Sequence, residues 1–341
     1  MKKILMAGLI VALGICFFPQ HCLALSFGYL LPNVNDAYGN MIDHMYSVIF
    51  WIVTIVFLIT EGFLVFCVIR YRSKEGRQAT YTHGNKYAEI IWTVIPAIIL
   101  IWLAIYQKQT WDFIREDFPP PNKSLTVQVF AQQFAWNFRY ADPKGSFGAP
   151  DDITTIDQMH VPVGKKVVIH MTSDDVIHDF FVPYARLKQD AVPGMLSESW
   201  FEMDKLGCWN LKSQTPMILT RKQFENLKVA LDGFLLMYKV LGVTGARKYY
   251  YEPMPGKKFA DVIYHGKVSR EPIAQVQYVQ HPFEIACSQL CGIGHYRMVG
   301  YLTVDTPASY RWWMKKMIKE KYQTNMRLWR VWDKYYPQYN N

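Results

Sequence analysis

The sequence lacks any Cys-x-x-Cys-His segment, which is the attachment motif of c-type haem. This absence excludes a c-type haem attached covalently to the chain. The polar composition of disordered proteins is also missing, because 51% of the 341 residues are hydrophobic and 16% are aromatic. The chain can therefore hold one good-sized core together with membrane segments.

Charge is almost absent from two long hydrophobic runs. Residues 46–69 are interrupted only by Glu61, and residues 90–106 contain no charged residue. At about 1.5 Å rise per residue, each run matches the hydrocarbon thickness of a bilayer. Pro96 predicts a bend in the second run that a neighbouring helix can compensate. We predict a transmembrane hairpin within residues 25–107.

The loop between the two runs is basic, with five Lys or Arg residues against one acid, Glu75. The positive-inside rule places this loop in the cytoplasm, so everything after Tyr106 lies outside. Residues 1–24 agree, because two lysines precede a short apolar run and small residues follow it. We interpret them as a cleaved signal peptide, in preference to a first span or a lipid-modified Cys22. The predicted location is the inner (plasma) membrane, multi-pass, with the external part in the periplasm.

From Ser124 onward, short β-type runs alternate with Gly and Pro turns. Residues 125–130, 166–171 and 299–304 are examples, each rich in β-branched or aromatic residues. We predict an external all-β sandwich or barrel over residues 108–306.

Four soft or borderline metal ligands stand within twelve residues: Cys287, Cys291, His295 and Met298. A thiolate pair, an imidazole and a thioether together favour copper over oxygen-preferring ions. A second imidazole, that of His178, follows a candidate strand and would complete the set. A mononuclear blue-copper site needs one cysteine, whereas two cysteines four apart can bridge two copper ions, with one histidine terminating each metal.

Other interpretations of this motif stay open at the level of sequence. A disulfide between the two cysteines suits an oxidising compartment but leaves the histidine and the methionine unexplained. Zinc accepts cysteine and histidine but has no use for a thioether. A buried structural histidine is common, and we prefer that interpretation for His160 and His170.

Together these residues resemble cytochrome c oxidase subunit II, over most of residues 41–207 and again over 283–306. The pattern His...Cys-x3-Cys-x3-His-x2-Met after a two-span hairpin carries the resemblance. It implies a cupredoxin-like external domain whose binuclear copper centre, CuA, accepts electrons from a separate cytochrome c. Subunit I would receive them at its haem, reduce oxygen to water and translocate protons. The implied metal ligands, with a backbone carbonyl at Gln289, are His178, Cys287, Gln289, Cys291, His295 and Met298.

The resemblance implies further roles. Glu89 matches a glutamate at the mouth of the proton channel called the K pathway, although an interfacial carboxylate beside a span is common. Trp136, in the aromatic segment 134–138, matches the region through which electrons arrive from cytochrome c. Phe134 departs from the tryptophan that many members carry at the presumed arrival point. Gln289 departs from a glutamate that helps to hold magnesium at the subunit I interface, so we expect a weaker or absent magnesium site.

Four aspartates cluster around the His178 segment and are candidates for the cytochrome docking face, where charge mainly sets the association rate. They are Asp174, Asp175, Asp179 and Asp190.

Two basic segments do not fit the family pattern. Residues 208–281 carry eleven Lys or Arg against five acids, and residues 307–341 carry eight against two, so each has a formal charge of +6. In the insert 208–281, a capping box at Thr220 precedes apolar residues at helical spacing as far as Tyr238. We therefore expect a largely helical insert and a basic, aromatic C-terminal helix. We predict that both bind other oxidase subunits or a cytochrome, or for the tail a membrane surface, and not nucleic acid.

Three other function classes compete with this interpretation. A quinol oxidase subunit II shares the hairpin but lacks the copper ligands that are intact here. Nitrous oxide reductase has a similar copper loop but not the two spans. A structural subunit with a relic copper loop stays open, because the insert adjoins that loop.

Overall fold

The structure is a computed structural model that divides the chain into two compact units. One unit contains residues 38–117, and the other contains residues 33–37 and 118–341. The predicted signal peptide lies outside the described residues. The structure describes residues 34, 35, 37–78, 81, 83–141, 147, 152–213, 215–232, 234–241, 246–253 and 256–335.

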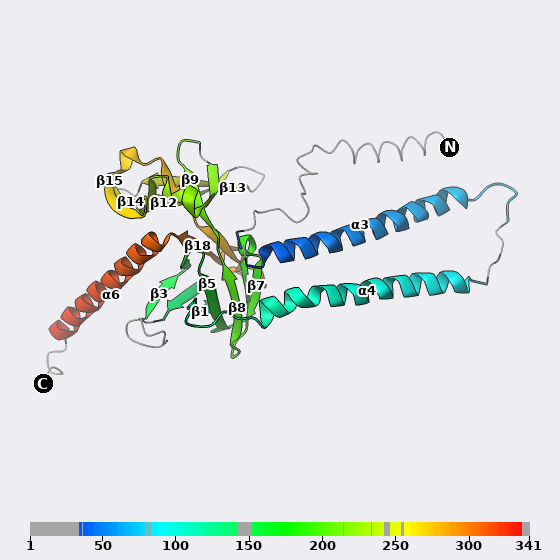
Figure 1. Ribbon diagram of the computed structural model, residues 1–341, viewed down its shortest axis with the longest axis horizontal. Coiled ribbons are helices and arrows are strands. Elements are labelled where there is room, and N and C mark those ends of the chain that lie inside the picture. The colour runs from blue at the N-terminus through cyan, green and yellow to red at the C-terminus, as the bar shows by residue number, and fades with distance from the viewer. Residues whose placement is uncertain are drawn as a thin grey trace. The chain divides into compact units, whose positions relative to one another are not determined.

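The first unit is a helical hairpin of α3 (Gly39–Arg70) and α4 (Lys86–Arg115), visible as the two long helices of Figure 1. Both are long and apolar enough to cross a membrane. They extend beyond the predicted spans because polar residues continue the helices past the apolar runs. The Asn85 side chain, for example, caps α4 by accepting the backbone N–H groups of Tyr87 and Ala88 at 3.0 and 3.3 Å.

The second unit contains two five-stranded sheets, which confirms the predicted β domain. Large aromatic residues lie between the sheets: the Trp136 ring centroid is 5.2 Å from that of Phe180, and Phe138 is 6.2 Å from Phe180. All three side chains are fully buried. One sheet has the order β3 (Ile153–Ile156), β2 (Ala135–Tyr140), β1 (Ser124–Gln132), β5 (Lys166–Ser173), β8 (Ser197–Glu202). The other has the order β4 (Gln158–Pro162), β18 (Val299–Asp305), β17 (Phe283–Cys287), β6 (His178–Val182), β7 (Leu187–Ala191), with the 3-10 turns η1 (Pro183–Ala185) and η3 (His295–Arg297) beside it.

The inserted segment folds mainly as strands. They form a six-stranded sheet in the order β10-β9-β16-β11-β14-β15 and a separate hairpin of β12 and β13. β9 and β16 pair with each other, so the extra sheet grows from the two strands that flank the insertion. The bounds are β9 (Lys205–Asn210), β10 (Thr215–Thr220), β11 (Val229–Asp232), β12 (Phe234–Leu241), β13 (Ala246–Pro253), β14 (Phe259–Tyr264), β15 (Lys267–Pro272), η2 (Ile273–Gln275) and β16 (Tyr278–Gln280).

The prediction of a largely helical insert is wrong. The capping box at Thr220 and Gln223 is present, but its helix, α5 (Arg221–Glu225), ends after five residues. Val229 and Ala230 are fully buried and pair with β14 and β16. Pairing with distant strands therefore overrides the local helical pattern, because strand preference depends on the neighbours that a residue packs against.

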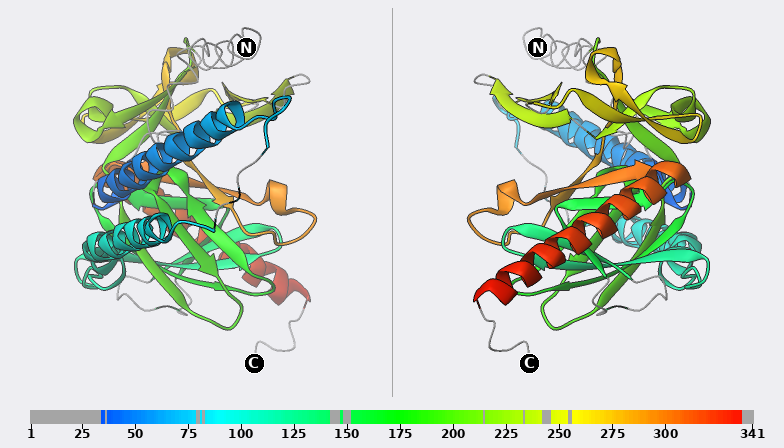
Figure 2. Two further views of the ribbon diagram at one scale, coloured as in Figure 1. Left: turned by 90° about the vertical axis from the view of Figure 1, so that its right-hand side faces the viewer. Right: turned by 90° about the vertical axis from the view of Figure 1, so that its left-hand side faces the viewer.

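The predicted C-terminal helix is present as α6 (Pro307–Tyr335), which lies against β3, β4, β15 and β18 (Figure 2). Trp313 anchors it, since its ring stacks on His160 with centroids 4.3 Å apart and packs edge-on against Tyr140 at 5.2 Å. His160 Nδ1 also lies 2.8 Å from a carboxylate oxygen of Asp305. These contacts support the structural interpretation of His160.

Candidate metal centre

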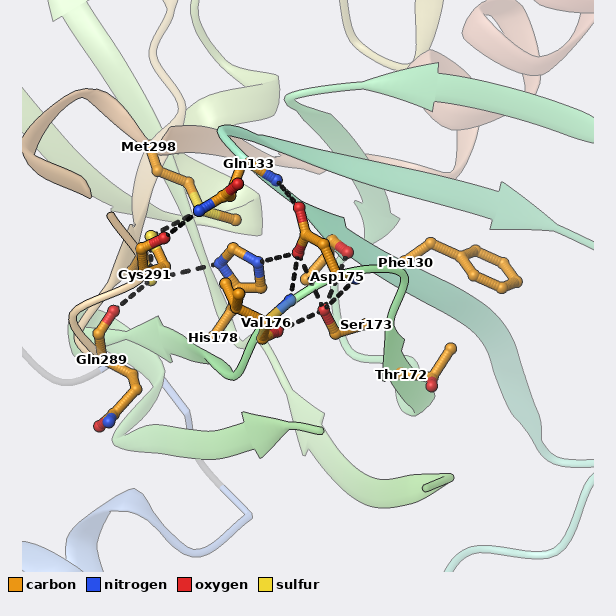
Figure 3. A network of polar contacts seen from close by, with 12 residues as sticks. Phe130, Gln133, Thr172, Ser173, Asp175, Val176, His178, Gln289, Cys291 and Met298 are labelled. Atoms are coloured by element: carbon orange, nitrogen blue, oxygen red, sulfur yellow. Dashed lines mark hydrogen bonds and ion pairs between the residues drawn. The ribbon is translucent and has the colours of Figure 1, made fainter. Parts of the chain in front are cut away.

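Pairing between β6 and β17 brings the predicted ligands together. His178 is the first residue of β6 and Cys287 is the last residue of β17, and Cys287 lies opposite Phe180 in the ladder. The chain then loops through Cys291 and continues to His295 in η3. The ladder therefore places an imidazole beside a loop that carries the remaining donors (Figure 3).

The two thiols are separate, with their sulfur atoms 3.9 Å apart. A disulfide bond has a length of about 2.05 Å, so the disulfide interpretation does not fit this geometry. Cys287 Sγ lies 3.9 Å from His178 Nδ1, whereas Cys291 Sγ lies 3.6 Å from His295 Nδ1. Each sulfur thus faces an imidazole of its own.

A weaker donor accompanies each thiol. The Cys287 sulfur is 3.2 Å from the backbone carbonyl oxygen of Gln289, and the Cys291 sulfur is 3.8 Å from Met298 Sδ. The Gln289 amide points away from the cluster in Figure 3. His178, both cysteines and Met298 are buried. His295 is half-buried and Gln289 is exposed, so the cluster lies at the edge of the core. Its sulfur, nitrogen and carbonyl donors suit copper better than a single zinc ion.

The Asp175 carboxylate bonds the His178 ring nitrogen that does not face Cys287. Asp175 Oδ1 lies 2.8 Å from His178 Nε2, so a proton on Nε2 leaves Nδ1 free toward the metal pocket. Burial raises the pKa of the Asp175 carboxyl, but hydrogen bonds from His178 and from the backbone N–H groups of Gln133 and Val176 outweigh it and hold the pKa below its usual value. This aspartate is therefore ionised near neutral pH and fixes the orientation of the ring.

The thiol of Cys291 is protonated in the metal-free protein near neutral pH, since burial and the neighbouring Cys287 raise its pKa to about 11. Copper binds the thiolate, so metal uptake must release this proton. Below the thiol pKa, we expect the apparent copper affinity to rise about tenfold per pH unit for each proton released. Competition titrations against a chelator of known pH dependence would measure this slope, and an affinity independent of pH would contradict thiolate ligation.

The two aromatic candidates for electron uptake occupy different positions. Trp136 is fully buried, with its ring centroid 6.1 Å from that of His178. Phe134 is half-buried, and its ring covers Gly294 so closely that an added Cβ there would lie 2.4 Å from it. Phe134 is thus the one of the pair that combines contact with the ligand loop and access to the surface.

One of the four aspartates predicted for the docking face does not fit that role. Asp179 is buried, with one carboxylate oxygen 2.7 Å from Ser288 Oγ and 3.2 Å from Lys188 Nζ. Asp174, Asp175 and Asp190 are exposed to solvent, and Asp175 also bonds His178. A docking role for these three stays a prediction. The sequence did not show that Ser288 of the ligand loop and Lys188 would contact this one carboxylate.

The ligand loop itself, residues 287–298, carries exposed apolar side chains. Leu290, Ile293 and Tyr296 are 79%, 96% and 67% exposed. These three residues were not predicted as functional, although they lie between the candidate metal ligands in the loop. Exposed apolar groups gathered at a functional loop indicate a binding surface.

Glu89 lies in the first turn of α4, where its negative charge is favourable beside the positive end of the helix dipole. The helix therefore provides a structural reason for an acid at this position, and a role in proton uptake stays a prediction.

Comparison with known proteins gives matches to both parts of the chain. The transmembrane domain of cytochrome c oxidase subunit II matches residues 25–109, and the periplasmic domain of that subunit matches residues 125–215. The second match stops before Cys287, within the segment where the insert begins.

Similar proteins include cytochrome c oxidase subunit 2 of Thermostichus vulcanus, which is 30% identical over 232 residues, covering 53% of this chain and 68% of the relative. The alternative cytochrome c oxidase subunit 2 of Bradyrhizobium diazoefficiens is 30% identical over 197 residues, covering 50% of this chain and 68% of the relative. A solved periplasmic domain of oxidase subunit II from Bradyrhizobium japonicum aligns at 19% identity with a TM-score of 0.34, covering 59% of this chain and 97% of that domain. On the two domain matches and these relatives, the chain belongs to the cytochrome c oxidase subunit II family.

Proposed function

We propose that this chain receives the electrons of its oxidase through a binuclear copper centre. The observation that carries the proposal is the pair of buried thiols 3.9 Å apart, each facing a different imidazole. Bound in this pocket, the copper pair would supply a one-electron carrier between a separate cytochrome c and the haem of subunit I, where oxygen is reduced to water and protons are translocated. Its proposed ligands are His178, Cys287, Gln289, Cys291, His295 and Met298.

The fold suits this role because it fixes donors that belong to separate segments. His178 and Cys287 are held by paired strands, so the distance between them follows from the sheet. Burial of His178, both cysteines and Met298 limits their contact with water, and hence the rearrangement that accompanies a change of charge. A rigid and dry ligand set is what electron transfer requires of the protein.

We propose that the electron donor docks over the exposed apolar side chains of the ligand loop and over Phe134. Trp136 is buried beside the His178 ring and Phe134 covers Gly294, so aromatic groups lie both at this surface and beside the pocket. Contact with the rest of the oxidase would involve subunit I, and Glu89 would stand at the mouth of its proton channel. We place the chain in the inner membrane as a multi-pass subunit, with the copper domain on the periplasmic side.

Magnesium is the second metal that the family resemblance raises. Gln289 offers an amide rather than a carboxylate, and an uncharged oxygen attracts a hard divalent cation less strongly. We propose that this oxidase holds magnesium weakly or not at all through this residue.

Metal analysis tests the copper proposal and the magnesium proposal together, with the full chain purified in detergent and loaded with copper. We expect two copper ions per chain, an EPR spectrum of one unpaired electron shared by both, and less than one magnesium per complex in the purified oxidase. One copper, zinc or no metal would favour the structural subunit with a relic loop. Tight stoichiometric magnesium would contradict only the magnesium proposal.

A further inference from the structure

The hairpin between β1 and β2 contacts both ligand-bearing segments through one residue, Gln133. Its backbone N–H donates to Asp175 Oδ2 at 2.7 Å, and Asp175 in turn bonds His178. Its side-chain Nε2 donates to the backbone carbonyl of Cys291 at 2.5 Å. Figure 3 shows both bonds leaving Gln133, one toward each segment. From this geometry we propose that Gln133 is a positioning residue for the metal centre, an inference that rests on the proposed function.

The hairpin fits closely against the ligand loop. Gly292 has a backbone φ of +133°, which residues with a side chain rarely adopt, and an added Cβ would lie 2.8 Å from Gln133 Nε2 and 3.3 Å from the Phe134 ring. Phe134 fills the space above Gly294 in the same way. Residues 133 and 134 therefore pack directly against the ligand loop, and the hydrogen bond from the Gln133 amide restrains the distance between that loop and the turn that contains Gln133.

The two ends of the ligand loop are held by different means. At the Cys287 end, Ser288 donates its backbone N–H to the Asp179 carbonyl at 3.2 Å and its hydroxyl to the Asp179 carboxylate at 2.7 Å. At the Cys291 end, the bond from Gln133 joins the loop to the turn between β1 and β2 of the other sheet. The Gln133 bond therefore helps to fix the separation of the two thiols, because it restrains the second cysteine relative to His178.

Substitution of Gln133 isolates this function, because its side chain is exposed and its backbone bond to Asp175 survives any side-chain change. Gln133→Ala removes the donor to Cys291, and Gln133→Glu replaces that donor with a carboxylate that repels the carbonyl. Gln132→Ala is the matched control, since Gln132 is the exposed preceding residue of the same hairpin. All are made in the full chain.

The measurement is the rate at which copper is lost to excess chelator, together with the EPR spectrum and the thermal unfolding of the copper-free chain. Loss of an outer contact to a metal site typically costs about 10- to 100-fold in affinity. We expect copper loss to be about tenfold faster in Gln133→Ala, faster still in Gln133→Glu, and unchanged in Gln132→Ala. The copper hyperfine splitting should change in both Gln133 variants. The unfolding temperatures of the copper-free chains should be equal.

Two results would overturn this inference alone. One is a wild-type rate of copper loss in Gln133→Ala, and the other is a lower unfolding temperature of the copper-free variant that accounts for its faster loss. If wild type binds no copper pair at all, the proposed function fails first and the positioning role fails with it.

Discussion

Replacing Cys291 with serine is expected to abolish the shared-electron copper spectrum and to slow electron uptake from cytochrome c by more than about 100-fold, beyond the usual effect of an outer contact. The Cys291 sulfur lies within 3.9 Å of the Cys287 sulfur, of His295 Nδ1 and of Met298 Sδ. A serine hydroxyl stays protonated and is a hard ligand, so it cannot replace a thiolate between two copper ions. EPR and copper analysis of the purified oxidase would measure the change.

Cys208→Ser is the control for this substitution. Cys208 is also a buried free cysteine, and burial raises its pKa to about 12, but it lies in β9, away from the ligand loop. The control should keep two copper ions and the wild-type spectrum. An unchanged copper pair in the Cys291 variant would show that the bridging assignment is wrong.

The proposed ligand set could be predicted from the sequence because most of it is local. Cys287, Cys291, His295 and Met298 belong to one short loop, and their softness alone favours copper. His178 is separated from Cys287 by 109 positions, and it was proposed from its place after a candidate strand and then matched through the family resemblance. The pairing of β6 with β17 is the physical reason for their proximity, and a single sequence does not reveal which strands will pair.

Features that depend on distant pairing were predicted poorly. The spacing of Phe224 and Leu227 fits a helix, and the first helical turn does form. From Val229 onward the chain is a strand, because Val229 is buried and pairs with two other strands. The contact from Gln133 to Cys291 was equally invisible, since 158 positions separate the two residues. The capping box at Thr220 was predicted correctly because it is local. The contacts that each side chain makes with distant residues could be seen only in the folded structure.

The second large effect concerns the two aromatic residues near the pocket. Trp136→Ala is expected to lower the free energy of unfolding by about 3–5 kcal/mol, the usual cost of removing a large buried ring. Its side chain has no exposed surface and packs against Phe180 and His178, so its loss leaves a cavity beside a ligand. Urea unfolding of the full chain in detergent, followed by far-UV circular dichroism, would measure the change.

Phe134→Ala separates electron uptake from folding. Phe134 is half-buried above Gly294, so we expect a loss of about 1 kcal/mol or less in the free energy of unfolding. If electrons arrive through this ring, uptake from cytochrome c should slow several-fold in Phe134→Ala while the copper spectrum persists. Phe134→Trp should retain or increase the rate, because it preserves an aromatic ring at the surface. Wild-type uptake by the alanine variant would instead place electron arrival at other residues of the ligand loop, and Tyr296, which is 67% exposed, would be the next aromatic side chain to substitute.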